Sequence, residues 1–91
     1  MTTKEKKRVA GKEATDQSDQ KKLVLFNDDF NTFDYVIDSL VEVCGHDPHQ
    51  AETCAWIAHF KGKCAVKKGD LATLKKYYNE MTFRRLTVEI Q

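Results

Sequence analysis

The segment Asn27-Asp28-Asp29 has the strongest potential for chemistry in this sequence, because it places an amide and two carboxylates directly after an apolar run. Such a group offers many hydrogen-bond acceptors, which suits a cation. Asn and Asp at such a place also form turns, in which their side chains bond to the nearby backbone. The triplet therefore leaves two interpretations open: a turn between a strand and a helix, or a site for a cation of unspecified kind.

His59 is the second candidate. It follows Ala55 by four residues in a stretch with helical signals, so the two share one helix face. A histidine near the end of a helix is favoured by the helix dipole. It can also serve as a hydrogen-bonding group at the rim of a groove, and the residue alone does not decide between these roles.

The sequence gives little support for a metal site or a catalytic cysteine. Cys44, Cys54 and Cys64 form no CxxC pair, and His46 and His49 lack the two-pair spacing of structural zinc sites. No glycine-rich phosphate loop occurs either. We therefore expect no metal, no cofactor and no enzyme activity.

Charge divides the chain into two parts. Residues 1–22 are basic and poor in apolar side chains, so we expect a disordered extension there, followed by one folded domain over residues 23–91. That domain is slightly acidic, which argues against nucleic-acid binding. No long apolar stretch suggests a membrane span or a secretion signal, and an odd number of cysteines favours reduced thiols, so we expect a cytoplasmic protein.

Capping residues and apolar spacing predict three helices. The first follows Asn31 or Thr32 as its cap and ends at Gly45, and the second runs from Pro48 to Gly62. The spacing of apolar residues also predicts a third helix from Asp70 to Met81, a turn at 67–69 and strands at 23–26, 64–66 and 84–90. The order β-α-α-β-α-β indicates an α+β fold, a three-stranded antiparallel sheet with three helices on one face.

Three segments together resemble the ClpS family, the bacterial adaptors of the Clp ATP-dependent proteases. They are LVLFNDDF at 23–30, YVID at 35–38 and AHFKGK at 58–63, and the resemblance extends from about residue 23 to residue 91. It implies recognition of N-degrons, which are proteins whose exposed first residue is large and hydrophobic. By this resemblance Asn27, Asp28 and His59, with Asp29 close by, bind the substrate's α-amino group. That group is mostly cationic at pH 7 and has three donors. His59 must be neutral to accept one, so acidification should weaken binding.

The resemblance also implies a hydrophobic pocket between the first two helices, formed by Phe33, Val36, Ala55 and Ala58. The two alanines stand where the family more often has Met and a larger aliphatic residue, and Phe33 stands where Met is frequent. Phe, Tyr, Trp and Leu are all candidates for the first residue of the substrate, and their ranking cannot be inferred from these substitutions.

The implied partner is a Clp AAA+ unfoldase of the ClpA or ClpC type, to which the domain would deliver its substrate. The third helix, from Asp70 to Phe83, is shorter than in many family members, so the unfoldase contacts there do not carry over. This shorter helix and the two alanines motivate an alternative: an interaction module of the same fold that binds an unfoldase or another protein without reading a first residue.

An unfoldase needs an unstructured segment to engage, which gives the charged extension a predicted role. Deleting Met1 to Gln20 should leave the affinity for a Phe-first peptide unchanged and slow the degradation of a Phe-first protein by the unfoldase and its protease. Equal degradation rates with and without the segment would remove this role from the extension.

Overall fold

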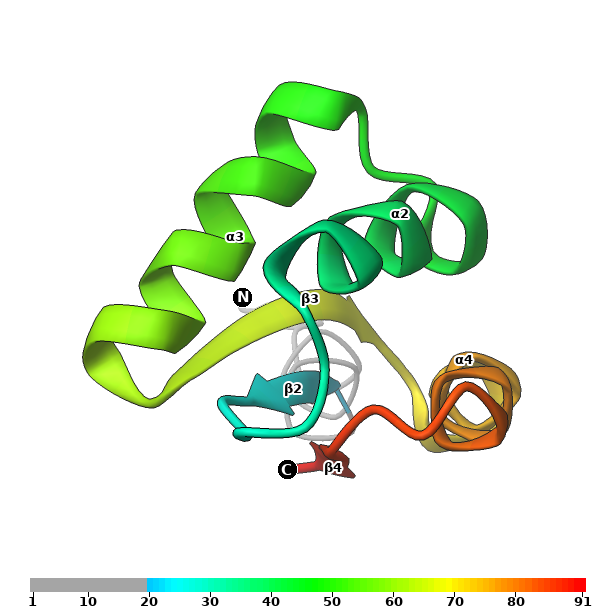
Figure 1. Cartoon of the computed structure of the whole chain (residues 1–91). Coiled ribbons are helices and arrows are strands. Elements are labelled where there is room, and N and C mark those ends of the chain that lie inside the picture. Colours follow the sequence, from blue (N-terminus) through cyan, green and yellow to red (C-terminus); the bar gives the residue numbers. More distant parts are fainter. Residues whose placement is uncertain (1–19) are drawn as a thin grey trace, which may run out of the picture.

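The computed structural model describes residues 20–91, so the predicted extension lies mostly outside the described residues. The described residues form three strands and three helices in the predicted order, and Figure 1 shows how they are arranged. The elements are β2 (Lys21–Phe26), α2 (Phe33–Cys44), α3 (Pro48–Lys61), β3 (Lys63–Gly69), α4 (Leu71–Phe83) and β4 (Val88–Ile90). The strand order is β3-β2-β4 and both pairings are antiparallel, which confirms the predicted α+β class.

The helix boundaries agree with the capping signals. The side chains of Thr32, Asp47 and Asp70 each accept a hydrogen bond from the backbone N–H three residues later. Gly45 and Gly62 end α2 and α3 with φ values of 73° and 95°, a left-handed conformation that glycine adopts without strain. Of the two proposed caps for α2, Thr32 has the role.

Strand β2 begins earlier than predicted. Lys21 and Lys22, which were assigned to the extension, pair with Gly69 and Lys68 of β3. The predicted turn at 67–69 is therefore wrong, since these residues continue β3 to its end. Their lysines indicated a solvated turn, but β3 is an edge strand, where lysine is common because it discourages pairing with other chains.

A bulge in β3 accommodates a buried histidine. The partner of Leu23 is Lys67 and the partner of Val24 is Ala65, so Val66 lies between two ladder pairs without a partner of its own. The Val66 carbonyl lies 2.8 Å from Nε2 of His46, which is buried in the connection between α2 and α3. His46, a conceivable metal ligand by type, therefore joins this connection to the sheet.

The last strand is shorter than the alternation of apolar and polar residues predicts. The prediction covered residues 84–90, whereas β4 is Val88–Ile90. Arg85 has a φ of 69°, its N–H donates to the Thr82 carbonyl and the N–H of Leu86 donates to the Met81 carbonyl. This is the hydrogen-bond pattern of a helix end that usually has glycine in the left-handed position. Because arginine stands there in this chain, no sequence signal marked the helix end.

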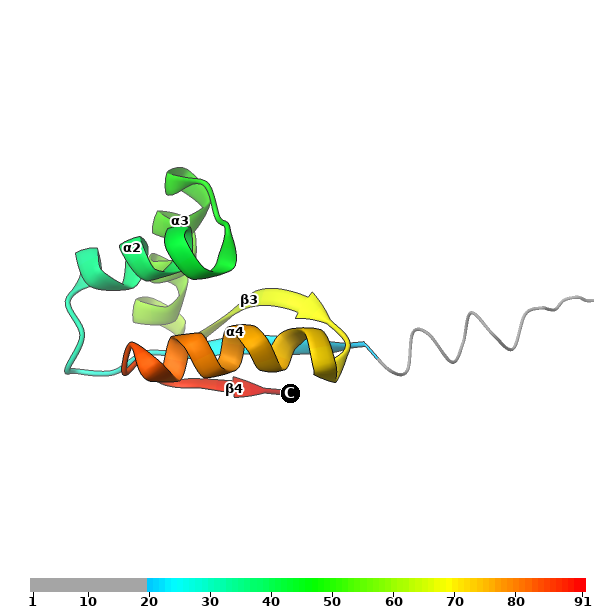
Figure 2. The same ribbon diagram turned by 90° about the vertical axis from the view of Figure 1, so that its right-hand side faces the viewer.

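The core lies between the helices and one face of the sheet. Leu23 and Leu25 of β2 contribute to a single buried cluster with residues from α2, α3 and α4. The other buried members are Leu40, Cys44, Ala51, Ala58, Val66, Leu74, Met81, Leu86 and Val88. All three helices therefore pack on the same sheet face, as predicted. Figure 2 shows α4 lying along the strands, with α2 and α3 above them. Within residues 20–91, no helix has the length and apolar character needed to span a membrane.

Gly62 is a position where a side chain should cost stability. A Cβ there has open space, but the φ of 95° is strained for any other residue. Gly62→Ala should lower the free energy of unfolding by about 1 kcal/mol, measured by urea denaturation. Gly69→Ala is the matched control: its Cβ would make ordinary contacts of 3.7–3.8 Å with Thr73 and Leu74. Equal losses in the two variants would contradict the backbone explanation.

Candidate functional site

One backbone hydrogen bond brings the two candidate segments together. The N–H of Asn27, directly after β2, donates to the carbonyl of Gly62, directly after α3, at 2.9 Å. The Gly62 N–H in turn donates to Ala58 within the last turn of α3. His59 lies in this same turn, so residues more than thirty positions apart in the chain face one space.

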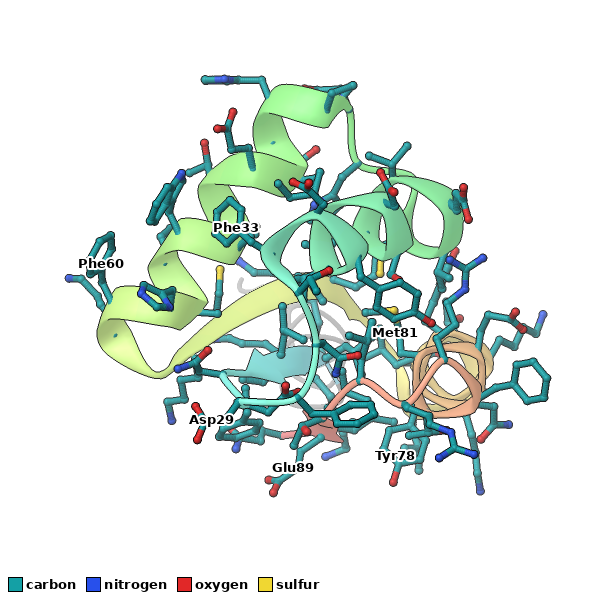
Figure 3. All side chains as sticks on the ribbon, viewed as in Figure 1. Asp29, Phe33, Phe60, Tyr78, Met81 and Glu89 are labelled. Atoms are coloured by element: carbon teal, nitrogen blue, oxygen red, sulfur yellow. The ribbon has the colours of Figure 1, made fainter. Side chains whose placement is uncertain are left out.

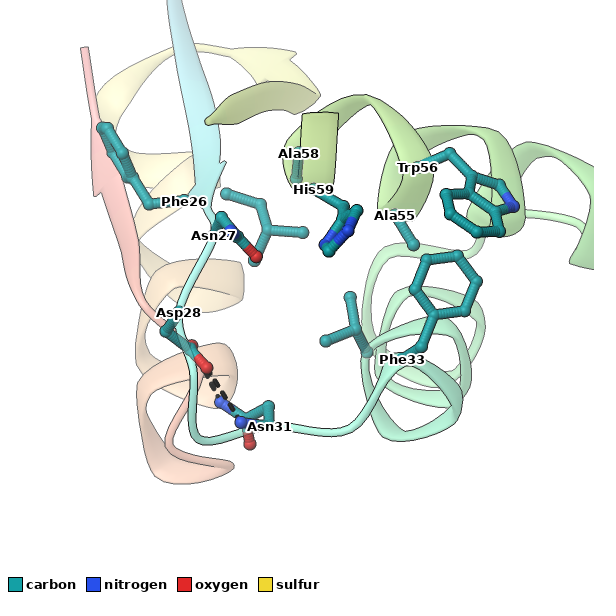
Figure 4. A pocket seen from close by; sticks show the side chains of 11 residues that line it. Phe26, Asn27, Asp28, Asn31, Phe33, Ala55, Trp56, Ala58 and His59 are labelled. Carbon is teal, nitrogen blue, oxygen red and sulfur yellow. Dashed lines mark hydrogen bonds between the residues drawn. The ribbon is translucent and has the colours of Figure 1, made fainter. Parts of the chain in front are cut away.

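That space is a cavity of about 470 Å³, a size typical of small-ligand sites. Seven of the eight predicted site residues line it: Asn27, Asp28, Phe33, Val36, Ala55, Ala58 and His59. Figure 4 shows Asn27 and Asp28 across the cavity from Phe33, Ala55 and Trp56. Asp29, the eighth residue, is exposed and does not line the cavity.

The Asp28 carboxylate organises the segment between β2 and α2. Its Oδ1 accepts the N–H groups of Phe30 and Asn31, at 2.9 and 2.8 Å. Its Oδ2 accepts the Asn31 side-chain amide at 3.0 Å and the Thr87 hydroxyl at 3.3 Å. Both oxygens thus accept two hydrogen bonds, which uses the full acceptor capacity of a carboxylate. The turn interpretation of this aspartate is confirmed, and the turn holds a negative charge at the cavity wall.

This hydrogen bonding keeps Asp28 ionised. Burial by itself would raise the pKa of its carboxyl, but the bonds from Asn31, Phe30 and Thr87 outweigh burial and lower the pKa below 3.8. Asp28 therefore carries its charge throughout the neutral range.

Asn27 and His59 retain hydrogen-bonding capacity. Within residues 20–91, neither the Asn27 amide nor the His59 imidazole has a hydrogen-bond partner in the protein, and both side chains are exposed enough to meet a ligand. The His59 ring is held by edge-on contacts with Phe60 and Trp56, at centroid distances of 5.0 and 6.0 Å. Together with Asp28 they give the cavity one polar side: an amide and an imidazole beside a fixed negative charge.

The opposite side of the cavity is apolar. Ala55 and Ala58 are almost completely buried, so their small side chains leave space where larger ones would fill it. The ring of Phe33 packs against Trp56 at 4.4 Å with an interplanar angle of 52°. This side can surround a hydrophobic group, while the polar side can hold a cation.

Four lining residues were not predicted from the sequence: Leu25, Phe26, Asn31 and Trp56. Trp56 follows Ala55 directly, and its type indicated a partly buried core residue. Asn31 was considered only as a helix cap. Its amide instead bonds Asp28 and the carbonyl of Arg85 at 2.9 Å, which ties the segment to the end of α4. No sequence pattern linked Asn31 to Arg85.

The cysteines contribute to the core. Burial raises the pKa of the Cys44 thiol to about 11 and that of the Cys54 thiol to about 12, so both are protonated at neutral pH. A nucleophilic cysteine requires the thiolate, which burial disfavours here. Over residues 20–91, no three His, Cys, Asp or Glu side chains gather in the manner of a metal site.

Comparison with known proteins gives matches of three kinds: to a curated protein, to a solved structure and to a family model. The ATP-dependent Clp protease adapter protein ClpS of Hydrogenovibrio crunogenus is 38% identical over 55 residues, which are 58% of this chain and 53% of that protein. The chain thus spans about half the length of this relative. The structure of Agrobacterium tumefaciens ClpS2 bound to L-phenylalaninamide matches with a TM-score of 0.74 and covers 80% of this chain and 95% of the other. Its sequence identity is 18%, so this likeness shows the shared fold.

The third match covers most of the domain. The model of the family ClpS, described as ATP-dependent Clp protease adaptor protein ClpS, matches residues 16–86. These residues include the Asn27-Asp28-Asp29 segment, both helices that line the cavity and the whole of α4. The chain therefore belongs to the ClpS family.

Proposed function

We propose that this protein is an N-degron adaptor: it binds the free α-amino group and the large hydrophobic first side chain of a substrate and delivers that substrate to a Clp AAA+ unfoldase. The observation that supports this most is the two-sided cavity. Asn27, Asp28 and His59 form its polar side, while Phe33, Val36 and the two alanines form its apolar side. Only the first residue of a chain carries a free α-ammonium group and a side chain on the same Cα.

The polar side suits an ammonium group. Asn27 Oδ1 and a neutral His59 ring each offer an acceptor, and Asp28 supplies the compensating charge. Direct contact between Asp28 and the ammonium would replace its longest bond, the one from the Thr87 hydroxyl at 3.3 Å. Hydrogen bonds from a charged donor are about twice as strong as neutral ones. An internal peptide bond has no such cation, which would explain selection for the free end of a chain.

The apolar side suits a large first side chain. Agrobacterium tumefaciens ClpS2, which shares this fold, has been seen with L-phenylalaninamide, a molecule with a free α-amino group and a benzyl side chain. In the present chain Ala55 and Ala58 leave room in the cavity, and the Phe33 ring borders that room. Phe, Tyr, Trp and Leu are therefore the first residues that we propose as ligands.

The proposed role requires binding and transfer without covalent chemistry. The family description names an ATP-dependent Clp protease, and we propose that the partner is its unfoldase component, of the ClpA or ClpC type.

Acetylation of the substrate tests the ammonium contact. A Phe-first peptide should bind in a fluorescence-anisotropy titration, and the same peptide with an Nα-acetyl group should lose binding, because acetylation removes the positive charge and two of the three donors. A peptide that begins with Ala controls for the side chain and should bind much more weakly. If no Phe-first peptide binds, the alternative of an interaction module without first-residue recognition takes the place of this proposal.

Asp28→Asn tests the fixed charge: the amide oxygen can still accept the N–H groups of Phe30 and Asn31, while the bond from the Asn31 side chain to Oδ2 is lost. The variant should weaken Phe-first peptide binding by about 1–3 kcal/mol, measured by anisotropy, with a cooperative urea transition showing that the fold is intact. An unchanged affinity would remove Asp28 from the proposed site.

The pH dependence of binding separates Asp28 from His59. The pKa of Asp28 is lowered, so its carboxylate stays charged when the pH falls from about 7.5 to about 5.5. The weakening of binding on acidification that the sequence predicts should therefore occur in both the native protein and Asp28→Asn, and it should be absent in His59→Gln. The only change left in His59→Gln should be a slight gain, because the α-amino group of the peptide becomes fully protonated. A loss of binding on acidification that persists in His59→Gln would assign the effect to another group.

A further inference from the structure

Three aromatic rings form a continuous row from the cavity to the surface. The Phe33 and Trp56 rings lie 4.4 Å apart, and the Phe60 ring stacks on Trp56 at 5.3 Å with an interplanar angle of 11°. We call Phe33, Trp56 and Phe60 the aromatic row. Phe33 and Trp56 line the cavity, while Phe60 is 73% exposed and lies beyond it. Figure 3 shows Phe60 projecting outward from the last turn of α3.

The aromatic row leaves a large apolar area exposed next to the cavity. Trp56 remains 43% exposed even though two aromatic rings contact it, and within residues 20–91 Phe60 adds an apolar surface that the helices and strands do not cover. A contiguous exposed apolar surface beside a pocket is typical of a ligand-binding groove. The row therefore extends the apolar side of the cavity out to the surface.

The position of the polar groups indicates the direction in which a bound chain would leave. In the proposed function the α-amino group lies against Asn27, Asp28 and His59, and the first side chain fills the cavity. The remaining bond from the first Cα, to its carbonyl carbon, then points out of the cavity. The His59 ring contacts both Trp56 and Phe60 edge-on, so the aromatic row lies next to the α-amino site at the rim. Figure 4 shows Trp56 across the cavity from Asn27 and Asp28. The substrate backbone would thus cross the rim beside the aromatic row.

We propose that the aromatic row is a second subsite, which binds the side chain of the third residue of the substrate and prefers an apolar or aromatic residue there. This inference rests on the proposed function and adds a preference to it. In an extended chain successive side chains point to opposite sides, so the second side chain points away from the surface and the third returns to it. The third Cα lies about 6.6–6.8 Å beyond the first, which places its side chain over Trp56 and Phe60 rather than in the cavity.

The two exposed rings define the kind of residue that fits. A Leu, Phe or Met side chain would cover apolar area on Trp56 and Phe60 that is otherwise in water, which favours binding in proportion to the area covered. A small residue such as Ala would cover little of it. A chain whose third residue is bulky and apolar should therefore be a better substrate than one with the same first residue and a small third residue.

The test uses two peptides of the same composition, Phe-Ala-Leu and Phe-Leu-Ala, each followed by the same polar sequence without Trp. We expect the peptide with Leu third to bind about threefold to tenfold more tightly in fluorescence anisotropy. Because the two peptides share the first residue, the charge and the total hydrophobicity, a difference between them reports only the position of the leucine.

Two variants assign that difference to the row. Phe60→Ala should reduce the preference for leucine in third position to less than about twofold, and its side chain is exposed enough for the fold to tolerate the change. Phe83→Ala is the matched control, because Phe83 is 83% exposed and lies at the end of α4, outside the row. It should keep the full preference. Loss of the preference in both variants would contradict the assignment to the row.

The single tryptophan of the chain gives a second readout that does not depend on affinity. At saturation, the peptide with Leu third should shift Trp56 emission to shorter wavelength than the peptide with Leu second, since the indole loses water. Tight binding of both peptides with equal affinity and equal emission would overturn the subsite and leave the proposed function standing. Failure of both peptides to bind would overturn the proposed function and, with it, the subsite.

Discussion

The hydrogen bond from the Asn27 N–H to the Gly62 carbonyl is the constraint on which the candidate site depends. It joins the end of β2 to the end of α3, and the left-handed conformation of Gly62 lets the chain reverse there into β3. His59 and the carboxylate segment therefore lie next to each other. The antiparallel ladder of β2 and β3 continues directly from this bond, with Phe26 paired to Lys63, so the junction serves the sheet and the site together.

The segment that follows this junction is rigid because its polar groups satisfy one another. Asp28 accepts from the backbone that follows it, Asn31 links it to the end of α4, and the Tyr35 hydroxyl donates to the carbonyl of Arg84. The cavity is thus bordered by a segment held in place before any ligand arrives. Such preorganisation reduces the entropy lost on binding, which lets a small domain recognise a small group. The apolar wall of the cavity includes Ala55 and Ala58 of α3, whose small side chains leave space that the packed core does not fill.

Local signals predicted the features that depend on local physics. The caps at Thr32, Asp47 and Asp70 and the glycines that end α2 and α3 act within one turn of the chain, so residue type and spacing suffice to find them. Features set by distant partners were predicted poorly. The lysines near the end of β3 are strand residues because β2 pairs with them, and the chain from Arg84 to Thr87 is not part of β4 because Arg85 takes a conformation that glycine usually provides.

The sequence by itself determined the order of the elements, the fold class and the chemical types at the site: acceptors after the first strand, an imidazole at the end of the second helix, and small residues on its inner face. Only the tertiary structure decided that these groups surround one cavity, that Asp28 is held by four donors, and that Trp56 and Asn31 belong to the wall while Asp29 does not. The physical reason is that a cavity is space left by the packing of separate elements. Its walls depend on how those elements meet, and no short stretch of sequence specifies that meeting.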